Sequence, residues 1–195
     1  MPAILRRSLI TLLFATLSSN VQALEKDLTN ALQTVGGIYG SIWIHEAGHA
    51  LTLNAFGATD ITIKVPREGC RLCGETLAKH PDEGYRPWQA QAIAGSGLFA
   101  ANLAGEFVIQ RKSLHGSPFA QSVLGTSLVS NAIHVYMYYT RHVGVDGYRG
   151  NDIDAFEAGG GNPHVFSAAL VGYTVWTLQR MQKNEIPFFY VNLRF

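Results

Sequence analysis

Charged side chains are scarce in this 195-residue sequence: they form 15% of it, against about 25% in an ordinary soluble domain. Neither sign of charge dominates, because 15 Lys and Arg residues are balanced by 14 Asp and Glu residues. This balance gives no reason to expect nucleic acid as a partner. The mean hydropathy of +0.08 is high for a soluble protein, so the composition favours a membrane-associated or unusually apolar protein.

Cysteine is nearly absent as well. The two cysteines, Cys70 and Cys73, stand in the sequence GCRLCG. A single CxxC pair supplies at most two zinc ligands, which excludes a four-cysteine structural zinc site. The flanking glycines and Pro66 indicate a loop, whereas a thioredoxin-like redox motif needs a strand–CxxC–helix setting. We therefore expect a local disulfide or two free thiols.

The first 23 residues have the pattern of a secretory signal. Arg6 and Arg7 precede an apolar stretch, and Val21-Gln22-Ala23 fits a cleavage site. The apolar stretch is about 12 residues long, and about 20 are needed to cross a membrane. We predict that residues 1–23 are a signal peptide, with an uncleaved N-terminal helix as the alternative. Residues 24–195 then form a single domain in a bacterial type of cell envelope.

Hydrophobic spacing and turn residues predict a mainly α fold. Apolar periodicity and long uncharged runs predict helices at residues 27–55, 88–110, 118–140 and 162–179. Alternating β-branched or apolar residues predict short strands at residues 59–65 and 187–195, with a loop at 66–87. We thus expect a small bundle of about four apolar, transmembrane helices, with a short β excursion after the first helix and a C-terminal strand.

The sequence HEAGH at residues 45–49 is the strongest indication of chemistry. His45 and His49 are four positions apart, so on a helix both imidazoles face one side and can bind one metal ion. Zinc binds neutral histidine nitrogen and in catalytic sites keeps one position for water, from which the neighbouring Glu46 can take a proton. Two histidines and a glutamate in an apolar helix are costly without partners. The motif therefore predicts a Zn²⁺ site with Glu46 as the catalytic base of a hydrolase.

A catalytic zinc site needs a third protein ligand, and an acidic stretch late in the chain offers three candidates: Asp146, Asp152 and Asp154. Asp152 is favoured because it opens a predicted short helix, stopped by three glycines, that would fix the direction of its carboxylate. Asn131 and His134 share one face of the predicted 118–140 helix. They are candidates for binding substrate or water near the metal, and an interhelical hydrogen bond is the alternative.

The segment IWIHEAGHALTLNAFGATDITIKVP (42–66) resembles the first core helix and following strand of the site-2-protease-like intramembrane zinc metallopeptidases. GNDIDAF (150–156) is similar to the element in which that family carries an aspartate as third ligand. GSGLFAANL (95–103) is loosely similar to its small-residue, Asn-bearing segment. The resemblance implies a Zn²⁺-dependent peptidase that hydrolyses peptide bonds within or next to a membrane. Its partners would be a membrane-associated protein or peptide substrate and membrane lipid.

Two other interpretations are kept beside this one. The chain could be an exported soluble zinc metallohydrolase, which would use the same chemistry in another setting. It could also be a non-catalytic membrane scaffold or interaction protein, whose histidines hold a structural metal or bond within a packed core.

Overall fold

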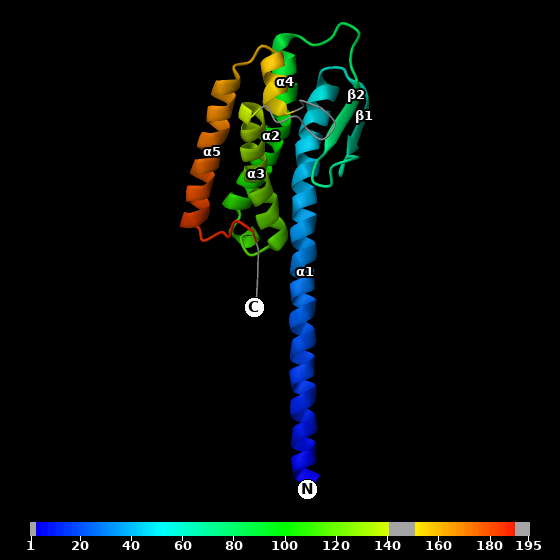
Figure 1. The fold of residues 1–195 in the computed structure, drawn as a ribbon, viewed down its shortest axis with the longest axis vertical. Helices are drawn as coiled ribbons and strands as arrows, with labels where there is room; N and C mark the ends of the chain where they lie inside the picture. The colour runs from blue at the N-terminus through cyan, green and yellow to red at the C-terminus, as the bar shows by residue number, and fades with distance from the viewer. Residues whose placement is uncertain (1–2, 141–150, 190–195) are drawn as a thin grey trace.

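The chain is mainly helical, with a small two-stranded sheet, in a computed structural model that describes residues 3–140 and 151–189 (Figure 1). The elements are α1 (Ala3–Ala55), β1 (Thr59–Lys64), β2 (Glu75–Lys79), α2 (Pro87–Gln110), a 3₁₀ turn (Lys112–Leu114), α3 (Pro118–Thr140), α4 (Asp152–Ala158) and α5 (Pro163–Lys183). The predicted mainly α fold with a short β excursion after the first helix is therefore confirmed.

Helix α1 is longer than the sequence pattern indicated. The helix predicted at residues 27–55 is its later part, because α1 begins at Ala3 and extends well beyond the other helices in Figure 1. It also runs through the residues predicted as a signal peptide, whose cleavage stays a prediction. Its end is as expected: the last helical residue is Ala55, and Gly57 takes the positive φ of 86° that favours glycine.

The segment predicted as a loop at residues 66–87 contains a strand, so that prediction was wrong in part. β2 pairs antiparallel with β1, with Thr62 opposite Leu77 and Lys64 opposite Glu75. The connection between them carries a disulfide between Cys70 and Cys73, one of the two states expected for this pair. The segment Glu75–Lys79 is short and alternates little, so its sequence alone predicts a strand only weakly. The strand forms because it pairs with β1.

Small residues let the helices of the bundle approach one another closely. A Cβ on Gly48 of α1 would collide with the Ser96 carbonyl of α2 and lie 2.8 Å from the Ala100 Cβ. A Cβ on Gly37, also in α1, would collide with the Phe119 carbonyl of α3. Glycines of α1 thus allow close packing both at the α1–α2 contact and at the α1–α3 contact.

Two apolar clusters hold the remaining helices together. One joins α2, α3 and the C-terminal end of α5, and consists of Val108, Ile109, Ala120, Leu124, Leu128, Met181 and Ile186. The other joins α2, α4 and α5 through Leu98, Ile153 and Leu170. A bidentate ion pair between Arg180 of α5 and Glu106 of α2, at 2.6 and 2.8 Å, adds a polar link between these helices.

Among the helices that the structure describes, α2 is the one both long and apolar enough to cross a membrane. Helix α3 has no charged residue over 23 positions, but its Gln, Ser, Thr, Asn and His side chains make it less apolar. The predicted C-terminal strand falls mostly on residues 190–195, outside the described residues, and residues 187–189 form no strand.

The packing at Gly37 gives a test of the fold. We expect Gly37→Ala to lower the free energy of unfolding by about 1–3 kcal/mol, because the new methyl group has no space against α3. The control is Gly36→Ala: there a Cβ would lie 3.7 Å from the Phe119 ring, an ordinary contact, so the gain in helix propensity should leave stability unchanged or raised by up to about 1 kcal/mol. Chemical unfolding followed by circular dichroism measures both, and equal effects would contradict the α1–α3 packing.

Candidate metal centre

The two histidines of HEAGH converge at the interface between α1 and α2. Their Nε2 atoms lie 3.2 Å apart, and their rings meet edge to face with centroids 4.8 Å apart. His45 is buried and His49 nearly so. The one-turn spacing in the sequence therefore produces the shared face that was predicted.

Helix α4 brings Asp152 to the same point. Asn151 caps this helix, because its side-chain oxygen accepts hydrogen bonds from the Ile153 and Asp154 amides at 2.8 and 3.0 Å. Ile153 is fully buried against α2 and α5, which fixes how the helix sits. Asp152 then places Oδ2 3.3 Å from His45 Nε2 and Oδ1 3.3 Å from His49 Nε2. Its side chain is only 13% exposed.

The two imidazole nitrogens have the separation of neighbouring ligands in a tetrahedral metal site. Two ligand atoms at ~2.0–2.1 Å from zinc, at a tetrahedral angle, lie about 3.3 Å apart, and the two Nε2 atoms lie 3.2 Å apart. The Asp152 carboxylate approaches them with different oxygens, Oδ2 toward His45 and Oδ1 toward His49, at 3.3 Å each. Two imidazoles and one carboxylate are the donor set of many catalytic zinc sites. In the part of the chain that the structure describes, these three residues form the group that could hold a metal ion.

Hydrogen bonding gives His49 the tautomer that a metal ligand needs. Its Nδ1 lies 2.8 Å from the Ile93 carbonyl oxygen, which can only accept a hydrogen bond. Nδ1 therefore carries a proton, and loss of the other ring proton would leave the lone pair of Nε2 facing the centre of the cluster. The Ser96 hydroxyl donates to the same carbonyl at 2.7 Å and holds this corner of α2 in place.

Gly97 of α2 leaves the space in front of both imidazoles. A Cβ at this position would lie 2.7 Å from His45 Nε2 and closer still to His49 Nε2. Both distances are too short for a real Cβ contact. Glycine at residue 97 thus keeps clear the space beside the two imidazoles, which we call the cradle.

Glu46 is held from the β-hairpin. The Thr76 hydroxyl of β2 donates a hydrogen bond to Glu46 Oε2 at 2.8 Å and lies 3.0 Å from its backbone carbonyl. Gly74 packs directly on the Glu46 side chain, where a Cβ would lie 2.7 Å from Oε1. Glu46 is 7% exposed. Its carboxylate is therefore fixed beside the cluster and not free to point to solvent.

His134 borders the cluster, as the sequence predicted. Its Nε2 lies 3.7 Å from Asp152 Oδ2, and its ring centroid is 5.5 Å from that of His45. Burial raises the pKa of Asp152, but the surrounding His134, His45 and His49 outweigh burial and hold that pKa below its usual value. Asp152 is therefore an anionic donor, which suits a cation at this point.

The other candidates occupy different places. Asn131 is 1% exposed and exchanges amide hydrogen bonds with Asn102 at 3.1 and 2.9 Å. It also donates to Thr174 at 3.1 Å. These are the interhelical hydrogen bonds that the sequence analysis gave as the alternative to substrate binding. Asp154 is outside the cluster, and Asp146 lies outside the described residues.

Sequence reasoning missed the residues that support the site. Thr76 and Gly74 belong to a segment taken for a loop, and Gly97 was noted only as part of the small-residue segment at 95–103. The Ile93 carbonyl carries no side-chain signal at all. The glycine-rich stretch after residue 94 could have indicated that this helix backbone lies close to the metal, if the stretch had been assumed to pack against HEAGH.

No protein-family model, curated protein or solved structure matches this chain. The chemistry of the site is therefore inferred from its own side chains: two imidazoles, one carboxylate, and a neighbouring glutamate held by Thr76.

The cradle at residue 97 gives a sharp test of metal binding. We expect Gly97→Ala to weaken zinc binding roughly 10- to 100-fold, because the methyl group displaces the imidazoles from their positions. Gly95→Ala is the matched control on the same helix, since a Cβ there would lie 3.7 Å from Phe166. Competition with a chromogenic chelator measures both affinities. If the two variants bind zinc as tightly as the unchanged protein, the ion is not bound at this place.

Proposed function

We propose that this protein is a zinc-dependent metallopeptidase that hydrolyses peptide bonds within or next to a membrane. The observation that carries the proposal is the convergence of His45 Nε2, His49 Nε2 and the Asp152 carboxylate, at separations of 3.2 and 3.3 Å. Supporting it are the cradle at Gly97 and the tautomer of His49. Zinc suits this nitrogen and oxygen donor set, and three protein ligands leave a fourth position open, as catalytic sites require.

The proposed chemistry divides between the ion and the side chains. When bound, zinc lowers the pKa of a water molecule and polarises the peptide carbonyl. Glu46 Oε1 or Oε2 takes the proton of the attacking water and later delivers it to the leaving amine. The Thr76 hydrogen bond holds the carboxylate for both transfers. His134, whose Nε2 lies 3.7 Å from Asp152 Oδ2, would contact substrate or water next to the ion.

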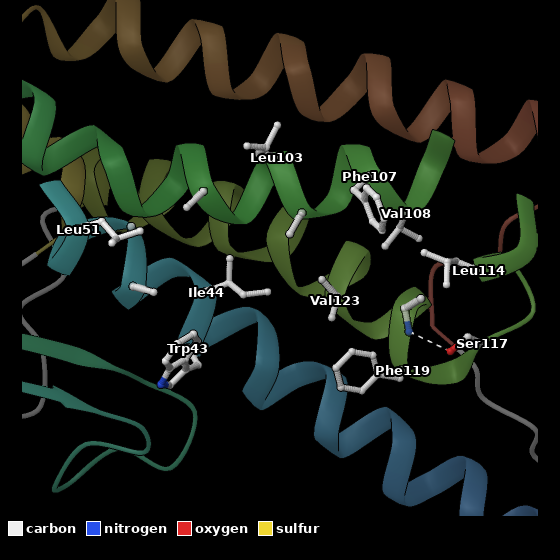
Figure 2. A pocket seen from close by; sticks show the side chains of 15 residues that line it. Trp43, Ile44, Leu51, Leu103, Phe107, Val108, Leu114, Ser117, Phe119 and Val123 are labelled. Carbon is white, nitrogen blue, oxygen red and sulfur yellow. Dashed lines mark hydrogen bonds between the residues drawn. The ribbon is translucent and has the colours of Figure 1, made fainter. Parts of the chain in front are cut away.

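Exposed apolar side chains support the membrane setting. On α2, Phe99, Leu103 and Phe107 repeat at four-residue intervals and are all more than half exposed. A pocket of about 610 Å³ lies between α1, α2 and α3. Figure 2 shows the side chains that line it, which are apolar except for Ser117. Apolar surface of this extent favours lipid over water. We infer that α2 and its neighbouring helices lie in the membrane of a bacterial cell envelope, and that the substrate is a membrane-associated protein or peptide.

The first test combines metal content with hydrolysis. We expect the purified protein to bind one zinc ion, and His49→Ala and Asp152→Ala to lose it. Asp154→Ala is the control and should retain it. Glu46→Gln should also retain zinc while hydrolysis falls about 10²–10⁴-fold, because only the proton transfer is removed. Elemental mass spectrometry measures the metal, and peptide mass spectrometry detects new termini in a mixture of detergent-solubilised membrane proteins.

Each interpretation predicts a different result in this experiment. Stoichiometric zinc with no cleavage by the unchanged protein would indicate a structural metal in a scaffold protein. Zinc retained in Asp152→Ala would assign the third ligand elsewhere. A folded sample without any transition metal, even after zinc is supplied, would overturn the proposal.

The membrane setting has its own test. After cell membranes are washed with alkaline carbonate, we expect the protein to remain in the pellet, because its apolar faces are in contact with lipid acyl chains. A soluble exported enzyme of known location, expressed in the same cells, serves as the control and should be released. Release of this protein into the wash would favour the soluble metallohydrolase.

A further inference from the structure

The pocket between α1, α2 and α3 is lined by both large and small apolar side chains. The large ones are about half exposed or more: Trp43, Leu51, Leu103, Phe107 and Phe119. The small ones are Ala47, Gly48, Ala100, Ala104 and Ala120. Apolar surface exposed on this scale is unfavourable in water, so the pocket suits an apolar occupant.

The shape of the pocket is elongated along the helices. On α1 its lining extends from Trp43 to Leu51, and on α2 from Ala100 to Val108. Eight residues of a helix advance by about 12 Å. The volume of about 610 Å³ lies within the ~300–1,000 Å³ of pockets that bind one small ligand. A hollow of this form fits a hydrocarbon chain that lies parallel to the helices.

One end of the pocket is polar and positively charged. Ser117, its polar lining residue, lies at the same end as Val108 and Leu114 in Figure 2. Helix α2 stops at this end, and Arg111 and Lys112 follow its last residue. The guanidinium carbon of Arg111 is 5.3 Å from the centre of the Phe107 ring, which lines the pocket. A cation therefore lies at the end of an apolar hollow.

The charges at this end are not neutralised by the protein. Neither Arg111 nor Lys112 forms an ion pair within the part of the chain that the structure describes. Glu106, earlier on α2, already forms a bidentate pair with Arg180 of α5. The turn that carries the two cations is held in place, because His115 Nε2 lies 3.0 Å from the Ile109 carbonyl oxygen. Two positive charges are thus available to an anionic group.

We propose that this pocket binds one acyl chain of an anionic phospholipid, whose phosphate group contacts Arg111 and Lys112. The inference rests on the membrane setting of the proposed function. The 24 residues of α2 span about 36 Å, slightly more than the ~30 Å of a hydrocarbon core. Arg111 then lies at the depth of the headgroups, and the acyl chain runs from there along α2. A guanidinium group is well suited to phosphate, and two cations favour an anionic headgroup over a zwitterionic one.

Trp43 provides a reporter inside the pocket. It is one of three tryptophans, and replacing Trp88 and Trp176 by Phe leaves it alone in the full chain. The protein is placed in phosphatidylcholine vesicles that contain either phosphatidylglycerol or phosphatidylcholine with brominated acyl chains, which quench nearby tryptophan. We expect the brominated phosphatidylglycerol to quench Trp43 at a several-fold lower fraction. Arg111→Gln should lower this preference about fivefold.

Two further variants separate the pocket from general surface charge. Lys183→Gln is the matched control, because Lys183 is a basic residue at the end of α5 and does not line the pocket. It should leave the preference unchanged. Ala104→Leu keeps every charge but fills the pocket, and it should lower the preference. An equal loss in Arg111→Gln and Lys183→Gln, or no loss in Ala104→Leu, would overturn the proposal.

The same measurement distinguishes this proposal from the proposed function. Equal quenching of Trp43 by the two brominated lipids would overturn the phospholipid site and leave a membrane peptidase possible. Quenching by neither lipid would also overturn it, because a second copy of the chain, a peptide or water would then cover Trp43. No zinc or substrate is needed, so Glu46→Gln should retain the lipid preference even if the chain hydrolyses no peptide bond.

Discussion

The structure depends on keeping one carboxylate and two imidazoles together in a nearly dry interior. Asp152 is anionic and 13% exposed, and among the described residues its Oδ2 has no hydrogen-bond donor. Burying such a charge is costly unless a cation accompanies it. A divalent ion among the Nε2 atoms of His45 and His49 and this carboxylate would meet the need directly. It would also tie α4, which has only seven residues, to the C-terminal part of the long helix α1.

Close approach of backbones is the steric condition for that arrangement. Gly48 permits α2 to lie against α1 one residue from His49, and Gly97 on the facing helix keeps the ion's position clear. A larger residue at either place would separate the helices or fill the cradle. The same contact orients the site, because the α2 carbonyl of Ile93 then lies 2.8 Å from His49 Nδ1. The same two glycines, Gly48 and Gly97, therefore allow both the helix packing and the arrangement of the ligand atoms.

The features that the sequence predicted correctly depend on residues close together in the chain. The one-turn spacing of His45 and His49, the terminating Gly57 and the short helix that starts at Asp152 each follow from a few neighbouring residues. The choice of Asp152 over Asp154 rested on helix geometry, and the structure brings Asp152 alone of these two into the cluster. What could not be predicted depends on tertiary contact: β2 forms through pairing with β1, Thr76 meets Glu46 across 30 positions, and Asn131 turns to Asn102 on another helix.

The distribution of polarity explains why the composition was ambiguous. Apolar side chains such as Phe99 and Leu103 face outward, while Ser41, Ser122, Ser127 and Asn131 are buried. In water this arrangement would be unfavourable on both counts, because apolar surface is hydrated and polar groups are desolvated. In lipid the outside would be favourable, since acyl chains would cover the apolar faces, and the polar interior would suit the proposed hydrolytic site. Four of the described charges lie within the helix bundle: Asp152 belongs to the cluster, Glu46 is held by Thr76, and Glu106 with Arg180 joins two helices.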